Sequence, residues 1–208
     1  PKKMKKMAWL HTDIEKNHWT DVAFQSREEE IACYQTFDKL ICVSTWVEKK
    51  AKQVLGNINT IVLYNPIDVK KIRNLSQNVV VLPQKSRIRI VSLGSLIPVK
   101  GYERLLKVVE RLKREGEQFE LLILGDGEKR PEYEAYIKKN NLEDCVKLMG
   151  YVDNPYPILK SADIYVCSSY AEGFNTAITE ALVLGRAIVS TEVSGVREQL
   201  GKYSEYGL

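Results

Sequence analysis

The feature that most constrains the fold is a series of five strand-then-helix units that runs from Arg87 to the end of the chain. Each unit begins with a short apolar run and continues with a helical pattern, as in RIRIVSLG with YERLLKVVERLKREG and FELLILG with PEYEAYIKKNNL. Parallel strands need helical crossovers, so this alternation predicts one parallel sheet with helices on both faces. We expect a Rossmann-like α/β domain over residues 87–208.

The sequence before Arg87 contains fewer strand-then-helix units. Three strand-like runs, KMAWLHT, DKLICVS and TIVLYNP, alternate with two helical stretches, and residues 66–86 are polar with two prolines and no clear period. Such a stretch is typical of a connector. We therefore expect residues 1–65 to be the C-terminal portion of an incomplete N-terminal domain, followed by a linker at 66–86. An incomplete sheet exposes a strand edge, through which the chain is expected to self-associate.

Composition excludes several classes of protein. With 44% hydrophobic and 28% charged residues the chain is typical of a soluble globular protein. A net charge of +4 without a basic, aromatic-rich stripe argues against nucleic acid as a partner. No run approaches the roughly 18 apolar residues that a membrane helix needs. Two interpretations stay open for Lys2, Lys3, Lys5 and Lys6: a solvated end, or peripheral contact with anionic lipid.

The cysteines and histidines show no spacing typical of a metal site, so no metal is expected. The chain has four cysteines and no C-x-x-C motif. We interpret them as reduced core residues of a cytoplasmic protein. These residues are Cys33, Cys42, Cys145 and Cys167.

In doubly wound sheets ligands bind beyond the carboxyl ends of the strands, which directs attention to the loops there. The loop Gly94–Gly101 follows a strand and opens a helix, where backbone N–H groups and the helix dipole attract an anion. Lys100 near a helix N-terminus is unfavourable unless an anion lies between them, so it either contacts a phosphate or is a solvated lysine. The loop lacks the G-x-G-x-x-G pattern of a dinucleotide site.

The loop of residues 168–176 leads into a second informative helix. Glu172 just before this helix either binds a ligand or only stabilises the helix N-terminus. Glu180 is different, because a carboxylate inside the apolar segment AITEALVLG needs a partner.

Taken together, these motifs resemble glycosyltransferase family 4, or group 1, which has the retaining GT-B architecture. The resemblance rests on LGSLIPVKGYERLL, FELLILGDG, VKLMGYV, ADIYVCSSYAEGFNTAITEALVLG and AIVSTEVSGVREQL. The E-x7-E signature formed by Glu172 and Glu180 is the most specific of them. The segments WLHTD, FDKLICVS and LYNPID are similar to the last third of the family's acceptor domain.

The resemblance implies roles for individual residues. Lys100 would bind the donor diphosphate, Glu180 the ribose hydroxyls and Glu172 the transferred sugar, while His11 would lie near that sugar. The remaining donor contacts are implied for Gly94, Ser95, Gly150, Tyr151, Val152, Gly173, Phe174, Asn175 and Thr176.

One position departs from the family pattern. Ser95 stands where relatives usually have an arginine that is a second diphosphate clamp, and a serine supplies no charge. Arg197 and Lys160 are the cations that we consider as replacements.

The implied function is retaining transfer of a sugar from a UDP- or GDP-sugar to a glycan, lipid-linked or small-molecule acceptor in polysaccharide biosynthesis. The nucleotide sugar is a substrate, and no cofactor is expected. The chain would carry mainly the donor-binding half, would be inactive by itself, and would act in the cytoplasm or at the inner face of the membrane. Two alternatives remain: a non-catalytic nucleotide-sugar-binding module, and a sugar-nucleotide epimerase, which should lack the Glu172 and Glu180 pair.

Overall fold

The structure is a computed structural model that describes residues 4–16, 22–80, 82, 87–201, 203 and 205–207. The chain forms two compact units, and the following paragraphs treat each by itself. Unit 1 comprises Pro1–Pro66, Ala171–Asn175 and Glu192–Gln199. Unit 2 comprises Ile67–Tyr170, Thr176–Thr191 and Leu200–Leu208.

Unit 1 is built on a parallel three-stranded sheet in the order β1-β2-β3. Its core contains Leu40, Val47 and Leu55, which are buried. Ser44 caps α2 by accepting a hydrogen bond from the backbone N–H of Val47 at 3.1 Å, which satisfies one of the free donors at a helix start. The elements are β1 (Met7–Leu10), α1 (Arg27–Gln35), β2 (Lys39–Cys42), α2 (Thr45–Leu55), β3 (Thr60–Val62) and most of α8 (Val196–Leu200).

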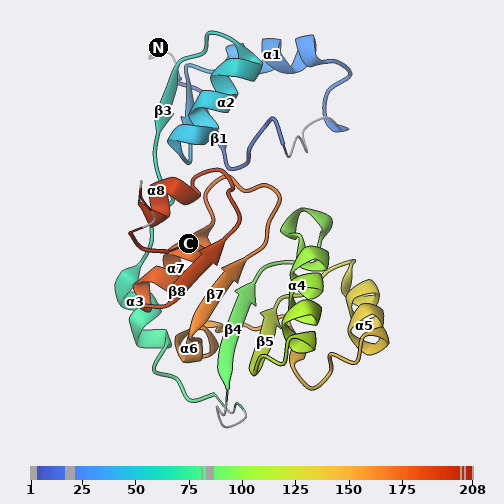
Figure 1. Cartoon of the computed structure of the whole chain (residues 1–208). Helices are drawn as coiled ribbons and strands as arrows, with labels where there is room; N and C mark the ends of the chain where they lie inside the picture. Colours follow the sequence, from blue (N-terminus) through green and yellow to red (C-terminus); the bar gives the residue numbers. More distant parts are fainter. Residues whose placement is uncertain are drawn as a thin grey trace. The chain divides into compact units, whose positions relative to one another are not determined.

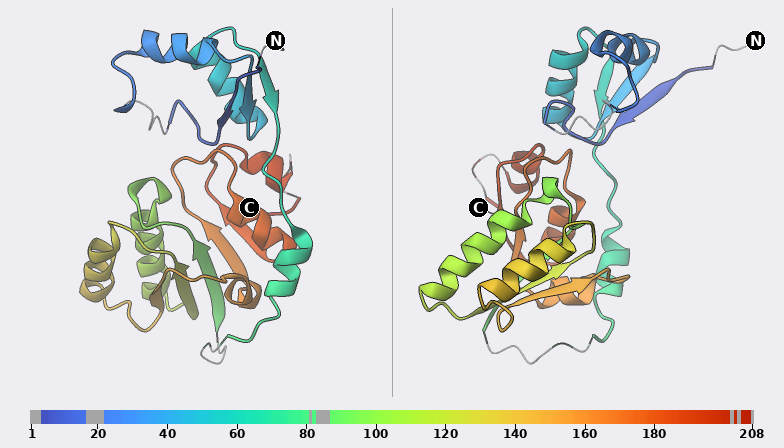
Figure 2. Two further views of the ribbon diagram at one scale, coloured as in Figure 1. Left: turned by 180° about the vertical axis from the view of Figure 1, so that it is seen from behind. Right: turned by 90° about the vertical axis from the view of Figure 1, so that its right-hand side faces the viewer.

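Unit 2 is built on a parallel five-stranded sheet in the order β6-β5-β4-β7-β8. Helices α4 and α5 cover one face of this sheet, and α3, α6 and α7 cover the other (Figure 1; Figure 2). The α/β fold with helices on both faces is therefore confirmed. The elements are α3 (Val69–Leu75), β4 (Ile88–Leu93), α4 (Tyr102–Arg114), β5 (Phe119–Leu124), α5 (Arg130–Lys139), β6 (Val146–Gly150), α6 (Tyr156–Ser161), β7 (Ile164–Cys167), α7 (Thr176–Val183) and β8 (Ala187–Ser190).

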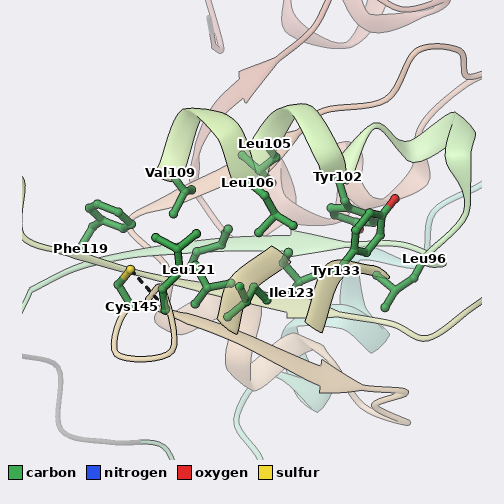
Figure 3. Packing of buried hydrophobic residues seen from close by; sticks show 13 residues of the cluster. Leu96, Tyr102, Leu105, Leu106, Val109, Phe119, Leu121, Ile123, Tyr133 and Cys145 are labelled. Carbon is green, nitrogen blue, oxygen red and sulfur yellow. Dashed lines mark hydrogen bonds between the residues drawn. The ribbon is translucent and has the colours of Figure 1, made fainter. Parts of the chain in front are cut away.

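The core of unit 2 lies between α4, α5 and the sheet. Leu106 of α4 and Leu121 of β5 are fully buried, and the rings of Tyr102 and Tyr133 meet edge to face (Figure 3). Every residue of β5 is buried, as expected for a central strand covered on both faces. This packing fixes the carboxyl ends of the strands, from which the candidate site is built.

The structure adds a helix to one expected segment and corrects one expectation. Residues 66–86, expected to be a linker, contain the helix α3, which Asp68 caps through the backbone N–H of Lys71 at 2.8 Å. The sequence showed no clear period there because a seven-residue helix is too short to reveal one. Cys33 is exposed on α1, whereas the other three cysteines are buried as expected.

Within the described residues, the longest and most apolar helices fall short of what crossing a bilayer requires.

Candidate functional site

The topology of unit 2 defines where a ligand is expected. The chain runs from β4 outward to β5 and β6, then returns to the other side of β4 for β7 and β8. The order of the strands therefore reverses between β4 and β7, and in open α/β sheets ligands bind beyond the carboxyl ends at such a switch point. The loops that leave β4 and β7 there are residues 94–101 and 168–175.

Hydrogen bonds join these two loops. The hydroxyl of Ser168 donates to the carbonyl of Lys100 at 2.9 Å, and the backbone N–H of Tyr170 donates to the carbonyl of Val99 at 2.8 Å. Gly101 makes the approach possible, because its φ is +62° and a Cβ there would lie 2.2 Å from the Ser168 carbonyl oxygen. A side chain at this position would separate the loops.

The loops after β5 and β6 lie at the same carboxyl-end edge of the unit 2 sheet. The N–H of Gly125 donates to the carbonyl of Gly150 at 2.8 Å, and the N–H of Gly94 donates to the carbonyl of Leu124 at 3.0 Å. A Cβ at Gly125 would lie 2.0 Å from the Gly94 carbonyl oxygen. Of the predicted donor contacts in unit 2, the structure thus brings Gly94, Lys100 and Gly150 together along one edge of the sheet.

Lys100 and Ser95 occupy different positions in their loop. Lys100 ends the 3₁₀ turn Pro98–Lys100, immediately before α4, and its side-chain methylenes lie 3.5 and 3.6 Å from where a Cβ of Gly94 would be. The lysine chain therefore lies over Gly94, near the N-terminus of a thirteen-residue helix. Ser95 is exposed. An anion at this edge would gain from the ammonium group and from the helix N–H groups.

Glu180 has the partner that its apolar surroundings require. It lies on α7 and accepts a hydrogen bond from the hydroxyl of Tyr156 on α6 at 3.1 Å. Burial raises the pKa of Glu180, and the bond from Tyr156 offsets part of this effect. Burial, together with the nearby Glu180 carboxylate, raises the pKa of Tyr156 to about 12, so the tyrosine keeps its proton and remains the donor.

Glu172 and His11 are brought together in unit 1. A Cβ at Gly173 would lie 1.9 Å from the His11 carbonyl oxygen, so the two backbones touch only because residue 173 is a glycine. The hydroxyl of Ser44 donates to the Gly173 carbonyl at 3.1 Å. Glu172 accepts a hydrogen bond from the side chain of Asn175 at 3.1 Å. The His11 ring is exposed and stacks on Trp9, with ring centroids 5.5 Å apart.

The other predicted contacts lie in varied surroundings. The Phe174 ring packs against Tyr64, with centroids 5.3 Å apart, and the Asn175 carbonyl accepts from Gln199 at 2.7 Å. Thr176, at the start of α7, is exposed. Tyr151, directly after β6, is also exposed, whereas Val152 is half-buried. A nucleotide base placed at residues 150–152 would therefore meet an exposed aromatic ring.

The two cations considered as replacements at Ser95 belong to different units, Lys160 to unit 2 and Arg197 to unit 1. Lys160 lies near the end of α6, which leads into the start of β7, so it lies at the amino-terminal edge of the sheet, opposite the switch point. Lys160 was therefore a wrong candidate. Arg197 is exposed in unit 1 and pairs with Glu192 at 2.7 Å. Over the part of the chain that the structure describes, no cluster of three His, Cys, Asp or Glu side chains fits a metal ion.

A pocket of about 440 Å³ lies in unit 1, between the start of α2 and residues 192–198. None of the predicted donor contacts lines it. The Glu198 carboxylate at this pocket accepts from the backbone N–H groups of Thr45 and Trp46 at 3.0 and 3.2 Å, and from Tyr64 at 2.8 Å. These groups serve the packing of unit 1, because Glu198 satisfies free donors at the start of α2.

Buried Asp13 organises the same region. Burial by itself would raise its pKa, but hydrogen bonds from the Ser194 hydroxyl, the backbone N–H groups of Lys16 and Glu15 and the Trp46 indole together lower it. Asp13 therefore stays ionised and fixes the chain two residues after His11. Sequence reasoning did not single out Asp13, because its side-chain partners, Ser194 and Trp46, come from distant parts of the chain.

Sequence reasoning also missed Tyr156 and Arg104. Tyr156 was an ordinary member of the apolar stretch PYPILKSA. Arg104 was one of several charges on an amphipathic helix, although its guanidinium donates to the carbonyls of Ser168 and Ser169. No local pattern distinguishes these residues, since both act on elements far away in the sequence.

The fold of unit 2 is an open, doubly wound α/β sheet, and its switch-point loops mark the edge where a ligand is expected. A model of the family "Glycosyl transferases group 1" matches residues 73–207, which is more than half of the chain. The chain therefore belongs to the group 1 glycosyltransferases.

Several relatives agree with this family. The chain is 35% identical over 148 residues to the N-acetylgalactosamine-N,N'-diacetylbacillosaminyl-diphospho-undecaprenol 4-alpha-N-acetylgalactosaminyltransferase of Campylobacter jejuni, which covers 71% of this chain and 39% of that protein. It is 32% identical over 118 residues to the phosphatidylinositol N-acetylglucosaminyltransferase GPI3 subunit of Saccharomyces cerevisiae, over 56% of this chain and 26% of that protein. The chain thus spans well under half the length of these relatives.

Solved structures show the same fold. HepE of Anabaena in complex with UDP-glucose matches with a TM-score of 0.77 at 22% identity, over 92% of this chain and 54% of that one. Sucrose-phosphate synthase of Thermosynechococcus elongatus matches with a TM-score of 0.78 at 20% identity, over 97% of this chain and 53% of that one. At these identities the likeness concerns the fold.

Proposed function

We propose that this chain carries the donor-binding half of a retaining, family 4 glycosyltransferase that takes its sugar from a UDP- or GDP-sugar. The observation that carries the proposal is the joined pair of loops at the switch point of unit 2, with Lys100 beside the N-terminus of α4. The named relatives transfer N-acetylhexosamines, and the structural neighbour HepE holds UDP-glucose. Both facts favour a nucleotide sugar as the donor.

The proposed roles follow from the chemistry of each side chain. Lys100 and the N–H groups at the start of α4 hold the diphosphate and stabilise its charge as it leaves. Glu180 accepts hydrogen bonds from the ribose hydroxyls, and Glu172 and His11 contact the transferred sugar. Backbone groups of residues 173–176 contact sugar and phosphate, and residues 150–152 border the base. Transfer then depends on positioning the acceptor hydroxyl beside the departing diphosphate.

The acceptor is proposed to be a glycan or a lipid-linked molecule, because the Campylobacter relative is named for a diphospho-undecaprenol substrate and the yeast relative for phosphatidylinositol. Lys5 and Lys6 are exposed and would favour an anionic membrane surface. Lys2 and Lys3 lie outside the described residues.

Calorimetry with UDP and GDP tests the donor site on the 208-residue chain. A charge-assisted hydrogen bond contributes about 1.5 to 3 kcal/mol. Glu180→Gln should therefore weaken nucleotide binding roughly tenfold to a hundredfold. Gln keeps an acceptor for Tyr156, so the substitution removes the charge while preserving the internal hydrogen bond. Unchanged affinity in the folded variant would reject the role of Glu180.

A non-catalytic binding module is the second candidate, because Ser95 leaves this loop without the second cation of the family pattern. The complete gene product, supplied with a panel of sugar nucleotides and candidate acceptors, distinguishes the two. Product detected by mass spectrometry supports the enzyme, whereas nucleotide binding without any transfer or donor hydrolysis supports the module.

A further inference from the structure

Arg104, the third residue of α4, contacts three consecutive residues of the loop after β7. Its Nε donates to the carbonyl of Ser168 at 2.6 Å, and its Nη2 donates to the carbonyl of Ser169. The guanidinium carbon lies 4.0 Å from the centroid of the Tyr170 ring. One side chain thus satisfies two backbone acceptors and stacks on the residue that follows them.

Other contacts hold the same three residues from both sides. Ser168 and Tyr170 donate to the carbonyls of Lys100 and Val99, as described above. From the opposite side, the hydroxyl of Thr191 donates to the Ser169 carbonyl at 2.6 Å. Residues 168–170 therefore form a bridge that is fastened to the Lys100 loop at one side and to the chain after β8 at the other.

We propose that Arg104 is a positioning residue for sugar transfer: it locks the segment that leads to Glu172 onto the loop that carries Lys100. This inference rests on the proposed function. Glu172 follows Tyr170 by two residues, so the segment that carries Glu172 starts directly after residues 168–170. Because a misplacement of about 1 Å near reacting groups costs on the order of a hundredfold in rate, such fastening is expected to matter for turnover.

The Lys100 loop has internal support of its own. The N–H of Lys100 donates to the Ile97 carbonyl at 3.1 Å, and the N–H of Gly101 donates to the Pro98 carbonyl at 3.1 Å. Loss of Arg104 should therefore loosen the Glu172 side while leaving the diphosphate side formed. The kinetic consequence is a fall in kcat with little change in the affinity for bare nucleotide.

The test compares Arg104→Met and Arg104→Lys with the control Arg111→Met. Arg111 lies on the same helix, and its side chain is 72% exposed and pairs with Glu115. In the complete gene product we expect Arg104→Met to lower kcat about ten- to a hundredfold, with UDP or GDP affinity changed by less than about threefold. Arg104→Lys keeps the charge but loses the planar fork, so it should restore only part of kcat. Arg111→Met should match the wild type.

Hydrogen exchange supplies a readout that does not depend on activity. In the Arg104→Met variant of the 208-residue chain, amides of residues 168–176 should exchange faster, while those of residues 94–101 should not change. Normal kcat in Arg104→Met, or unchanged exchange at residues 168–176, would overturn the positioning role. A tenfold loss of nucleotide affinity would also overturn it, since this would indicate direct contact with the donor. If the wild type itself neither binds UDP or GDP nor transfers sugar, the proposed function fails instead, and the exchange result still decides whether Arg104 holds the loop.

Discussion

Glu180 is a residue whose charge costs stability in the folded chain. Burial raises its pKa above the ordinary value of 4.5, so the folded state binds the proton more tightly than the unfolded state does. The stability that this group contributes is fully present below about pH 4.5 and is lost as the pH rises through the folded-state pKa. A residue kept under that cost is expected to serve function.

Glu180→Gln should therefore become more stable relative to the wild type as the pH rises from about 4 to about 8, because glutamine does not ionise. Urea unfolding of both proteins at several pH values measures this difference. Glu117→Gln is the control, since Glu117 is exposed and its charge stays hydrated. A difference between Glu180→Gln and wild type that does not change with pH would show that the carboxylate is not destabilised in the folded chain.

Glu172 should respond differently, because it is proposed to touch the sugar and not the nucleotide. Glu172→Gln retains an acceptor for the Asn175 side chain, which now donates to Glu172 at 3.1 Å. We expect turnover of the complete gene product to fall by about a hundredfold or more, while the affinity for UDP or GDP changes less than about twofold. Steady-state kinetics and calorimetry measure the two quantities. Turnover close to that of the wild type would refute the role.

At the scale of elements, the join between the two switch-point loops depends on Gly101. Gly101→Ala places a Cβ 2.2 Å from the Ser168 carbonyl oxygen and a non-glycine residue at a φ of +62°. Gly116→Ala is a matched control, because Gly116 also has a positive φ, +86°, but a Cβ there meets nothing within 4 Å. We expect the control to lose about 1 kcal/mol of unfolding free energy and Gly101→Ala at least about 2 kcal/mol, together with nucleotide affinity. Equal losses would show that the loops are not held at Gly101.

Local periodicity explains which elements were predictable. All five strand-then-helix units appear, since each is encoded within its own residues, and α4 ends beside Gly116 as such a helix should. The buried pair of Arg89 on β4 and Glu120 on β5, joined at 2.7 Å, was not predictable. It depends on which strands become neighbours and in what register, and no local pattern contains that information.

The residues of the candidate site also divide into those that a local sequence pattern predicts and those that it does not. The sequence indicated that Glu180 needs a partner, but not that the partner is Tyr156, which lies 24 residues away. Likewise, Lys100 and Glu172 were recognisable from their motifs, whereas Arg104 acts on residues 64 and 65 positions later in the chain. Residues that satisfy a local rule can be found from the sequence, and those that hold distant segments together need the structure.

At the scale of the whole molecule, different spectroscopic signals report on the unfolding of the two units. Trp9, Trp19 and Trp46, the three tryptophans of the chain, all fall within Pro1–Pro66 of unit 1. Tryptophan fluorescence therefore reports on unit 1, whereas far-UV circular dichroism reports on both units. Lys100 and Glu180, the residues proposed to bind the nucleotide itself, both belong to unit 2.

A nucleotide that binds the folded chain must stabilise it through mass action. At about ten times its Kd, UDP or GDP contributes ~1.4 kcal/mol. This should raise the thermal midpoint seen by circular dichroism by about 3 to 6 °C. Uridine or guanosine at the same concentration is the control, because the nucleoside lacks the diphosphate that Lys100 is proposed to hold, and should give a smaller shift. If the nucleotide shifts only the transition that tryptophan fluorescence reports, and the rest of the circular dichroism transition stays at its original temperature, the nucleotide binds unit 1. This result would contradict the assignment of the diphosphate and ribose to Lys100 and Glu180.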